Sequence, residues 1–361
     1  MTPWPTGSPP SPAWSPAPTW RVGRLRAWSA KVWRDGLRAL LVEELKPEYG
    51  GCVLKEIETP APGPGEVQVK VRAAAVNFPD LLQTRGEYQH KPPLPFIPGL
   101  EIAGEVSALG EGVDQFQIGE PVVGGARVGG FSEYAVTPAA GLRRKPEGLS
   151  FSQAAGYATA YLTAYVSLVR RAAVQPGEWV LVHGAAGGVG LAAVDLAKHL
   201  GCKVIAASAS DDKLAIVERE YRPDAVVNVT GGFREKVKEI TGGRGANVIY
   251  DPVGGDVFDE STRCIAFDGR LLVVGFASGR LPVLPVNMAL IKGFSVMGVR
   301  AGEYGRQFPE KGRENQAAIW DLAAQMKPRV DQEYPLGDWR AAFDSLAERK
   351  VVGKTIVRPD L

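Results

Sequence analysis

Cysteine and histidine are both scarce in this chain of 361 residues. Its three cysteines, Cys52, Cys202 and Cys264, are odd in number and lie far apart. That pattern excludes a disulfide framework and a structural zinc knuckle, and it favours a reducing compartment. The three histidines stand at no short metal-ligand spacing from one another, so they do not indicate a metal site either.

The chain also lacks a long hydrophobic run and a strong excess of charge. No apolar stretch approaches the roughly 18 residues that cross a bilayer. Lys and Arg number 42 against 40 Asp and Glu, and a formal charge of +2 is too small for a nucleic-acid-binding protein. We therefore expect a soluble enzyme or binding protein, located in the cytoplasm, with no nucleic-acid partner and no membrane association.

Acidic residues are absent from the first 34 residues, which hold seven prolines, five tryptophans and five basic residues. Proline at this density prevents helix and central strand. A disordered tail, or upstream sequence read from an early start codon, explains the composition, and an organelle transit peptide is the alternative. We treat residues 1–36 as an N-terminal extension outside the fold.

Two patterns of secondary structure follow one another. Between residues 37 and 160, short strands alternate with glycine and proline turns, which predicts a compact β-barrel-like domain. After Ser150 strands alternate with helices, which indicates βαβ units and a parallel sheet, and hence the α/β class. The strands expected there are Trp179–His183, Lys203–Ala207, Ala225–Val227, Val248–Tyr250 and Arg270–Val274. The helices expected are Phe151–Arg171, Leu191–Leu200, Asp211–Glu220, Phe233–Ile240, Glu314–Met326 and Asp338–Glu348, with a last strand at Lys354–Arg358.

The strand Trp179–His183 runs into a glycine-rich turn that ends at Gly190, and a helix opens at once. A dinucleotide pyrophosphate binds to backbone N–H groups at a helix N-terminus, where no Cβ blocks its approach. Gly187 and Gly188 allow that approach, and Gly190 allows the helix to pack tightly on the strand. A plain tight turn is the alternative, but the flanking strands and helix agree with nucleotide binding. The loop residues expected at the cofactor are Ala186, Gly187, Gly188, Val189 and Gly190.

The end of the second strand indicates which nicotinamide cofactor binds. An NAD enzyme places Asp or Glu there, about 20 residues past the loop, on the ribose 2′-hydroxyl. Ser208 stands at that position, so no carboxylate repels a 2′-phosphate, and Lys213 can supply the opposite charge. A solvated surface role for Lys213 is the alternative. We predict NADPH as the cofactor in preference to NADH.

Three motifs together resemble the zinc-independent medium-chain dehydrogenase/reductases, and within them the NADPH:quinone oxidoreductases. These motifs are His183–Gly190, Tyr250–Gly255 and Asn77–Asp80. The resemblance covers nearly everything outside the N-terminal extension. It implies a GroES-like catalytic domain at 37–160, a Rossmann NADP-binding domain at 161–294, and a C-terminal return at 295–361 that completes the first domain.

The resemblance also bears on metal. Zinc-dependent relatives carry a catalytic cysteine where this chain has Asn77, and Gly-His-Glu where it has Gly99-Leu100-Glu101. They also carry a lobe of four clustered cysteines for a structural zinc, which this sequence lacks. Asn and Leu in place of two ligands leave no site that Zn²⁺ would hold, so we expect no metal.

The segment from Asn77 to Tyr88 resembles the stretch that lines the substrate cleft in quinone reductases and enoyl-thioester reductases. The resemblance gives Asn77 a hydrogen bond to the substrate carbonyl or to the cofactor ribose, and it makes Tyr88 a candidate proton donor. Packing of Tyr88 against Pro92 and Pro93 is the alternative. Quinone reductases carry a second tyrosine where this chain has Leu82, so the pocket is more apolar and a mechanism with two phenols is disfavoured.

Further cofactor contacts follow from the resemblance alone. Thr163 corresponds to a residue near the nicotinamide. Arg349 matches a basic position that approaches the cofactor, with a solvated helix-end charge as the alternative. Val229 replaces a tyrosine of the family's 2′-phosphate site, which weakens the preference for NADP. The loop that clamps the nicotinamide in the family corresponds to Phe276, Ala277 and Ser278.

These observations favour a metal-independent, NADPH-dependent reductase that transfers hydride to a quinone or an α,β-unsaturated carbonyl compound. One alternative is an enoyl-thioester or enone reductase in which Tyr88 donates the proton. Another, from a different class, is a non-catalytic nicotinamide-binding protein with a structural or RNA-binding role, which the near-neutral charge does not support.

The stretch Leu281–Asn287 is apolar and contains Pro282 and Pro285. We expect it to be extended and to lie at a sheet edge, where proline is tolerated. A bare apolar edge invites aggregation, so something should cover it. In the family this region pairs with its two-fold mate, and we predict a C2 homodimer built through residues around 270–300. A loop folded over its own domain is the alternative.

Overall fold

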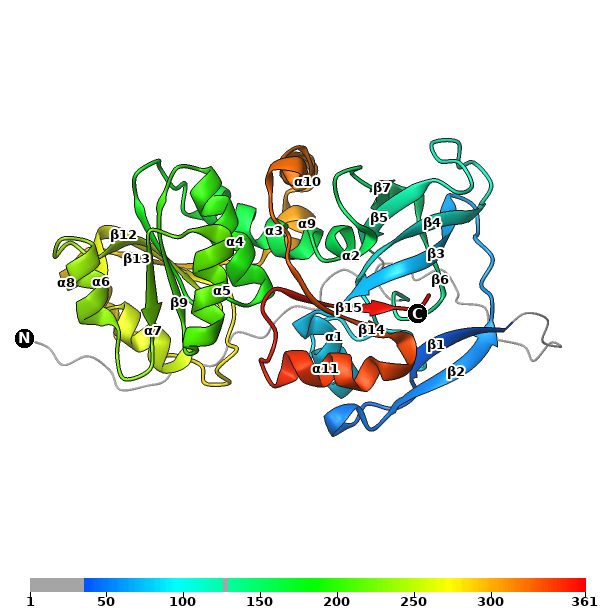
Figure 1. Ribbon diagram of the computed structural model, residues 1–361, viewed down its shortest axis with the longest axis horizontal. Coiled ribbons are helices and arrows are strands. Elements are labelled where there is room, and N and C mark those ends of the chain that lie inside the picture. The colour runs from blue at the N-terminus through cyan, green and yellow to red at the C-terminus, as the bar shows by residue number, and fades with distance from the viewer. Residues whose placement is uncertain (1–35, 126–128) are drawn as a thin grey trace, which may run out of the picture. The chain divides into compact units, whose positions relative to one another are not determined.

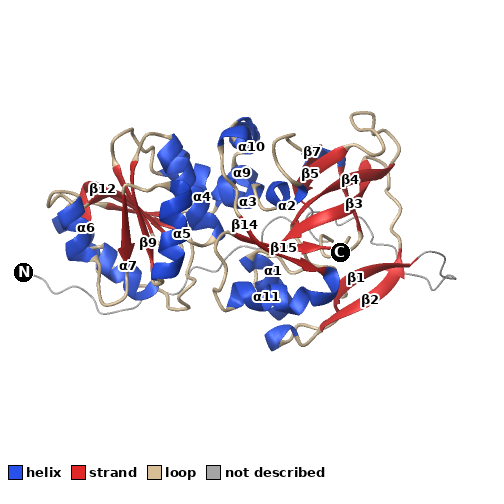
Figure 2. Cartoon of the chain, viewed as in Figure 1, coloured by secondary structure: helices blue, strands red, loops and turns tan. Residues whose placement is uncertain are grey.

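The computed structural model describes residues 36–125 and 129–361. Residues 1–35, which make up nearly all of the predicted N-terminal extension, lie outside this part of the chain. The described residues form two lobes, each built on its own β-sheet (Figure 1, Figure 2). Among these residues, no helix combines the length and the hydrophobicity needed to cross a membrane.

The first lobe is a mainly antiparallel sheet with the strand order β14-β15-β3-β4-β5-β7, in which β6 also pairs with β3. A separate hairpin, β1-β2, contacts the chain segments that precede β4 and β6, through bridges from Val42 to Phe96 and from Ala39 to Ser132. Its strands are β1 (Gly36–Val42), β2 (Cys52–Glu58), β3 (Glu66–Ala75), β4 (Glu101–Leu109), β5 (Pro121–Gly125), β6 (Tyr134–Pro138), β7 (Leu142–Arg144), β14 (Val330–Pro335) and β15 (Lys354–Arg358). Its helical segments are η1 (Pro47–Tyr49), α1 (Phe78–Arg85), η2 (Ala139–Gly141), α2 (Phe151–Ala155), η5 (Leu336–Asp338) and α11 (Trp339–Ala347).

The C-terminal end of the chain completes this first sheet. β14 and β15 run parallel to each other, and β15 pairs antiparallel with the far end of β3. A strand formed more than 250 positions after β3 therefore lies next to the residues that follow β3, and it brings Lys354 beside Asn77. The bounds predicted for this last strand, Lys354–Arg358, are those observed.

The second lobe is a parallel sheet with the strand order β10-β9-β8-β11-β12-β13, the doubly wound order of a Rossmann fold. The α/β class is confirmed. Its strands are β8 (Trp179–Val182), β9 (Lys203–Ser208), β10 (Ala225–Asn228), β11 (Ala246–Asp251), β12 (Ile265–Val273) and β13 (Ser295–Gly298). The helices that connect them are α4 (Gly188–His199), α5 (Asp211–Tyr221), α6 (Arg234–Ile240), α7 (Gly255–Ser261) and α8 (Val286–Lys292). The segments that flank this sheet in sequence are α3 (Ala158–Tyr165), η3 (Val166–Arg171), α9 (Ala301–Gln307), α10 (Pro309–Asp321) and η4 (Ala323–Gln325).

Four predicted elements differ from the structure. The helix expected over Glu314–Met326 is α10, which begins and ends five residues earlier and is followed by η4. The strand expected over Arg270–Val274 is β12, which begins five residues earlier. The single helix expected over 151–171 is three segments, α2, α3 and the π-helical η3. The stretch Leu281–Asn287 is not an extended edge strand: Pro285 is the N-cap of α8, and the strand at this edge of the sheet is β13. Pro285 precedes the first helical residue and so removes no hydrogen bond within α8, which lets the same residue fit a helix start as well as a sheet edge.

Three clusters of buried side chains make up the core. One fills the first lobe and includes Phe131, Trp339 and Phe343. Another packs under α6 and α7 on one face of the parallel sheet. The third covers the opposite face under α4 and contains residues of both sheets, such as Ala75 and Val182. The two lobes therefore share the third cluster, while each also has a cluster of its own.

Candidate functional site

Asn77 lies between the end of β3 and the start of α1. It is the N-cap of that helix, and its backbone N–H donates to Asp80 Oδ2 at 2.8 Å. The other oxygen of Asp80 accepts a hydrogen bond from the Gly99 N–H, at 3.2 Å. Asp80 is fully buried, and burial raises the pKa of its carboxyl to about 7, although the Asn77 N–H and the charge of Lys354 lower it. The hydrogen bond from its N–H to a buried carboxyl group therefore fixes the backbone of Asn77 at the start of α1.

The side chain of Asn77 lies in a buried polar cluster. Its Nδ2 donates to Glu101 Oε2 at 2.9 Å and to the Ala75 carbonyl at 3.4 Å, while its Oδ1 accepts from Lys354 Nζ at 2.6 Å. Lys354 Nζ also forms an ion pair with Glu101, at 3.6 Å. The second oxygen of Glu101 accepts from the N–H of Thr159 in α3, at 2.6 Å. Both N–H bonds of the Asn77 amide are thus used, and only its oxygen can take a further partner.

The glycine-rich loop has three glycines whose surroundings differ. A Cβ at Gly190 would lie 2.1 Å from the carbonyl oxygen of Gly184, so close packing of α4 on the strand requires glycine there. A Cβ at Gly188 would lie 2.8 Å from Lys354 Cδ. A Cβ at Gly187 would meet only the Gly184 oxygen, at an ordinary 3.4 Å. The protein's own packing leaves the Gly187 side of the loop open, as a phosphate at the start of α4 would require.

The segment Arg349–Lys354, here called the junction segment, connects the C-terminal sheet strand to this loop. Gly353 donates its N–H to the Ala186 carbonyl at 2.8 Å, and it forms a parallel bridge with Gly187. The next residue, Lys354, then passes Gly188 and reaches Asn77. The structure therefore joins two expected site residues, Gly187 and Asn77, through Gly353 and Lys354, which were not among the predicted site residues.

Lys213, which is expected at the 2′-phosphate, lies in a second group of contacts with other residues expected at the cofactor. Lys213 donates to the Arg349 carbonyl and, at 3.2 Å, to the Val351 carbonyl, and Arg349 donates to the Ala277 carbonyl. Ser208 ends β9, and its Oγ accepts a long 3.4 Å hydrogen bond from the Ser210 N–H. Lys213, Arg349 and Ala277 are thus connected in one chain of contacts through the junction segment.

The remaining expected residues make few contacts with the rest of the candidate site. Thr163 Oγ1 donates to the Thr159 carbonyl one helical turn back, and Phe276 and Ser278 are exposed on the loop after β12. Val189 is half-buried in the first turn of α4. Tyr88 is half-buried, and its hydroxyl has no hydrogen-bond partner among the described residues.

His183 in the glycine motif is not a candidate acid or base. Its Nε2 contacts Ser261 Oγ at 2.8 Å, and the ring packs edge-on against Phe233. Burial lowers its pKa to about 3, so the ring stays neutral in ordinary buffers. Within residues 36–125 and 129–361, no group of three or more His, Cys, Asp and Glu side chains could hold a metal ion.

Three residues of the buried cluster were not predicted to act at the site: Asp80, Glu101 and Lys354. Only the capping pattern of Asn77 and Asp80, three positions apart, was available as a local signal. Lys354 lies 277 positions from Asn77, and no periodicity or spacing connects the two.

Two family descriptions match the sequence: the alcohol dehydrogenase GroES-like domain over residues 63–147, and the zinc-binding dehydrogenase over residues 188–315. Over 293 residues the chain is 41% identical to a quinone oxidoreductase-like protein 2 homolog of Nematostella vectensis, covering 80% of each chain. It is 37% identical to the quinone oxidoreductase-like protein 2 of Bos taurus, over 94% of this chain and 99% of that protein.

Solved structures agree with these matches. A probable oxidoreductase from Mycobacterium abscessus superposes with a TM-score of 0.81 at 36% identity, over 90% of this chain and 99% of its own. A mycobacterial protein solved in complex with NADPH gives a TM-score of 0.80 at 31% identity, over 89% of this chain and all of its own. The CurK enoyl reductase gives 0.79 at 27% identity, over 90% and 99%.

A GroES-like lobe joined to a Rossmann lobe, with a glycine loop at the start of α4, defines a medium-chain dehydrogenase/reductase. The predicted superfamily and its enzyme class are confirmed. Within that superfamily, the chain belongs to the quinone oxidoreductase family.

Proposed function

We propose that this protein is a metal-independent, NADPH-dependent reductase that passes hydride to a quinone or an α,β-unsaturated carbonyl compound. The observation that carries the proposal is the open side of Gly187 at the start of α4, in a loop joined to Asn77 through the junction segment. The NADPH complex of a relative at 31% identity supports the choice of cofactor.

The chain's own residues fit a dinucleotide phosphate. We assign the pyrophosphate to the N–H groups of the loop Ala186–Gly190, and the 2′-phosphate to Ser208 and Lys213. The ammonium of Lys213 now contacts neutral carbonyl oxygens, and a phosphate oxygen is a stronger acceptor for it. When bound, NADPH supplies the hydride. The other residues assigned to the cofactor are Thr163, Phe276, Ala277, Ser278 and Arg349.

A metal has no role in the proposed reaction. The carboxylate of Glu101 and the amide oxygen of Asn77 already hold the ammonium of Lys354, at 3.6 and 2.6 Å. A divalent cation placed on the same two oxygen ligands would face a fixed positive charge at close range.

We assign Asn77 to the cofactor and Tyr88 to the substrate. Because both N–H bonds of the Asn77 amide are used, we assign its oxygen to a hydroxyl of the cofactor ribose and not to the substrate carbonyl. The free hydroxyl of Tyr88 suits a proton donor, which reduction of an activated alkene requires. A quinone can take its protons from solvent, so it does not depend on Tyr88.

The substrate class is tested by NADPH oxidation with a panel of quinones, enones and a crotonyl thioester, repeated with NADH. We expect turnover with quinones and enones, and a lower KM for NADPH than for NADH. Tyr88→Phe should reduce kcat with enones and spare quinones. Binding of NADPH without turnover on any acceptor in the panel would contradict the proposal.

An enoyl-thioester reductase is the second candidate, and the free hydroxyl of Tyr88 is the observation that favours it. Likeness to the CurK enoyl reductase agrees with this candidate. NADPH oxidation with the crotonyl thioester but with none of the quinones would establish it in place of the first.

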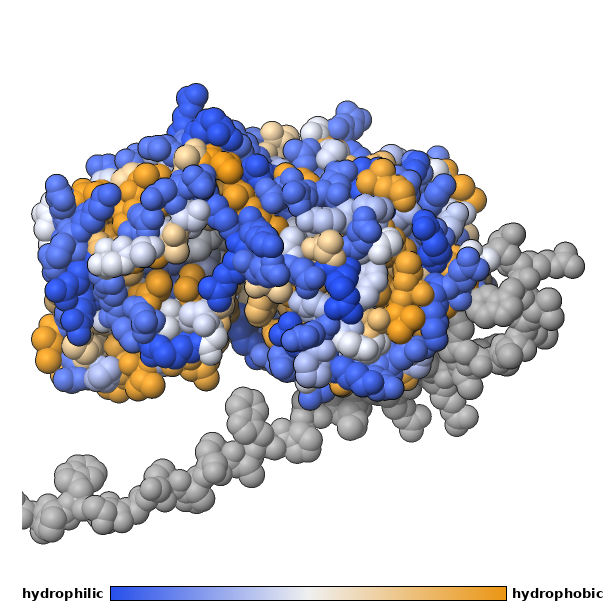
Figure 3. All heavy atoms as spheres, turned by 60° about the horizontal axis from the view of Figure 1, so that its bottom comes forward, coloured by the Kyte–Doolittle hydropathy of each residue, from blue (hydrophilic) through white to orange (hydrophobic). Residues whose placement is uncertain are grey.

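We also propose that the protein is a C2 homodimer through α8 and the edge strand β13. Figure 3 shows hydrophobic residues exposed on the Rossmann-like lobe, which carries α8. β13 has one free edge in the described sheet, and α8 has no buried residue. The apolar residues of this surface, each at least 66% exposed, are Phe267, Leu281, Val283, Val286, Leu290 and Ile291. Bare apolar area of this kind is typical of an interface, and an edge strand is covered best by its two-fold mate.

Light scattering should give twice 38.6 kDa, and Leu290→Glu should shift the mass toward the monomer.

A further inference from the structure

Lys354 touches two different parts of the candidate site. Its aliphatic chain lies against the glycine-rich loop and α2, since a Cβ added at Gly188 or at Gly156 would lie 2.8 or 3.2 Å from it. Its ammonium reaches Asn77 Oδ1 at 2.6 Å and Glu101 at 3.6 Å. The side chain is only 11% exposed, so water cannot replace these partners.

Two opposite charges fix the orientation of the Asn77 amide. The oxygen faces the ammonium of Lys354, and the NH₂ group faces the carboxylate of Glu101. Rotation of the amide by half a turn would place NH₂ against the ammonium and oxygen against the carboxylate. Both contacts would then be repulsive in a buried setting, where charge interactions are strong.

We propose that Lys354 is a positioning residue that acts through Asn77. It holds the amide oxygen in place and keeps Asn77 at a fixed distance from the loop that Lys354 itself contacts. The inference rests on the proposed function, in which that oxygen receives a hydroxyl of the cofactor ribose. A misplaced oxygen would leave NADPH bound but badly aligned, so the loss falls on kcat.

Side-chain amide exchange tests this placement without any turnover. The Asn77 amide signals, assigned by their loss in Asn77→Asp, should exchange with solvent about tenfold faster or more in Lys354→Met, and near the wild-type rate in Lys354→Arg. The matched control is Arg358→Met, which removes a cation from the other end of β15 and should leave the exchange rate unchanged. If Lys354→Met does not fold, Lys354→Gln, neutral and one bond shorter, replaces it. Equal exchange rates in wild type and the neutral variant would overturn the proposal.

A double-mutant cycle tests whether Lys354 acts through Asn77. In wild type, Lys354→Met, Asn77→Ala and the double variant, we measure kcat and the Kd of NADPH separately. We expect each single variant to lose about tenfold or more in kcat, and the double variant to lose little beyond Asn77→Ala. Additive losses, or a Lys354→Met effect confined to the Kd of NADPH, would overturn the proposal. Absence of turnover in wild type would instead contradict the proposed function, and the exchange measurement would still stand.

Discussion

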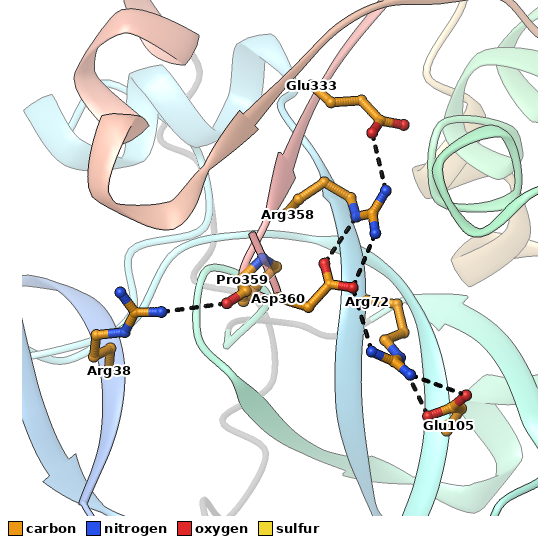
Figure 4. Close-up of polar contacts among 7 residues, drawn as sticks. All are labelled: Arg38, Arg72, Glu105, Glu333, Arg358, Pro359 and Asp360. Carbon is orange, nitrogen blue, oxygen red and sulfur yellow. Dashed lines mark hydrogen bonds and ion pairs between the residues drawn. The ribbon is translucent and has the colours of Figure 1, made fainter.

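The strand β15 begins at a buried cation and ends at a partly exposed one, and the two cations are held differently. Lys354 has one hydrogen bond and one ion pair, both to buried side chains. Arg358 donates to both oxygens of Asp360, at 2.8 and 2.9 Å, and to Glu333 at 2.9 Å (Figure 4). Asp360 also pairs with Arg72, so the charges there are shared over several partners.

The two ends of β15 differ in whether a lost charged partner can be replaced. At the Arg358 end, another partner or water can compensate for a lost one, so each contact has little effect on stability. At the Lys354 end, removal of one partner leaves the other as a buried, unpaired charge, which is strongly unfavourable. The buried end is also the one that touches the glycine loop. A single strand thus combines a structural ion network with a positioning residue.

The largest effect is expected from Glu101→Gln. It leaves the ammonium of Lys354 without a carboxylate, and it weakens the acceptor that the Thr159 N–H uses. We expect the free energy of unfolding to fall by roughly 3–5 kcal/mol in denaturant titrations. Glu105→Gln, which removes a carboxylate from the Arg72 side of the exposed network, is the matched control. Equal losses in the two variants would erase the distinction between the ends.

The free energy of unfolding should depend on pH through Asp80 and through Asp360, with opposite signs for the two groups. Burial raises the pKa of Asp80 to about 7, so the folded state binds its proton more tightly than the unfolded state does. Stability from this group is full below about pH 4, the unfolded pKa, and is lost as the pH rises to about 7. Arg358 lowers the pKa of Asp360, so its contribution is present above the unfolded pKa and is lost as the pH falls below it.

Denaturant titrations across this range measure the effect as a difference between variants. Between about pH 4 and about pH 7, wild type should lose roughly 2–4 kcal/mol more than Asp80→Asn. Asp360→Asn should flatten the curve only at lower pH. A parallel course of wild type and Asp80→Asn would show that Asp80 is ionised throughout.

A smaller loss is expected from Gly188→Ala. Its new Cβ would lie 2.8 Å from Lys354 Cδ and 3.3 Å from the Gly353 oxygen, so the buried end must shift to admit it. We expect a loss of roughly 1–3 kcal/mol in the free energy of unfolding. Gly187→Ala adds the same atom where packing is ordinary, and it should change stability by less than about 1 kcal/mol. The reverse order would mean that Lys354 is not packed against the loop.

The smallest effect is expected from Arg358→Met. We predict a loss below about 1 kcal/mol, because the side chain is 24% exposed and its carboxylate partners can turn to water or to Arg72. The loss should shrink further with added salt, which screens partly exposed pairs more than buried ones. A salt-independent loss as large as that of Glu101→Gln would show that Arg358 is held as tightly as a buried charge, and it would contradict the difference between the two ends of β15.

The sequence predicted the Rossmann-like lobe well, because its signals are local. Each signal lies within one short window of residues. This holds for the strands β8, β9 and β10 and for the glycine turn between β8 and α4. The helix over 151–171 was too long in prediction, since apolar spacing alone does not reveal the breaks between α2, α3 and η3.

The candidate site was predicted only in part. Asn77 and the glycine loop carry motifs, but the cation that connects them comes from the last strand, 277 positions after Asn77. Lysine at the start of a strand resembles many solvated lysines, and only the tertiary fold shows that this one is buried. Likewise, the structure shows that Gly188 faces Lys354 while Gly187 is open, which glycine spacing alone could not distinguish.

The Kd of NADPH, measured by fluorescence for wild type and Gly187→Val, tests most directly whether the glycine loop binds the cofactor. The branched side chain would fill the side of the loop that the protein leaves open, where we place the pyrophosphate. We predict that wild type binds NADPH, and that Gly187→Val binds it at least about tenfold more weakly, a loss of about 1.4 kcal/mol, with an unfolding midpoint close to that of wild type. The same affinity in both proteins would contradict the assignment of NADPH to this loop, and with it the proposed reductase.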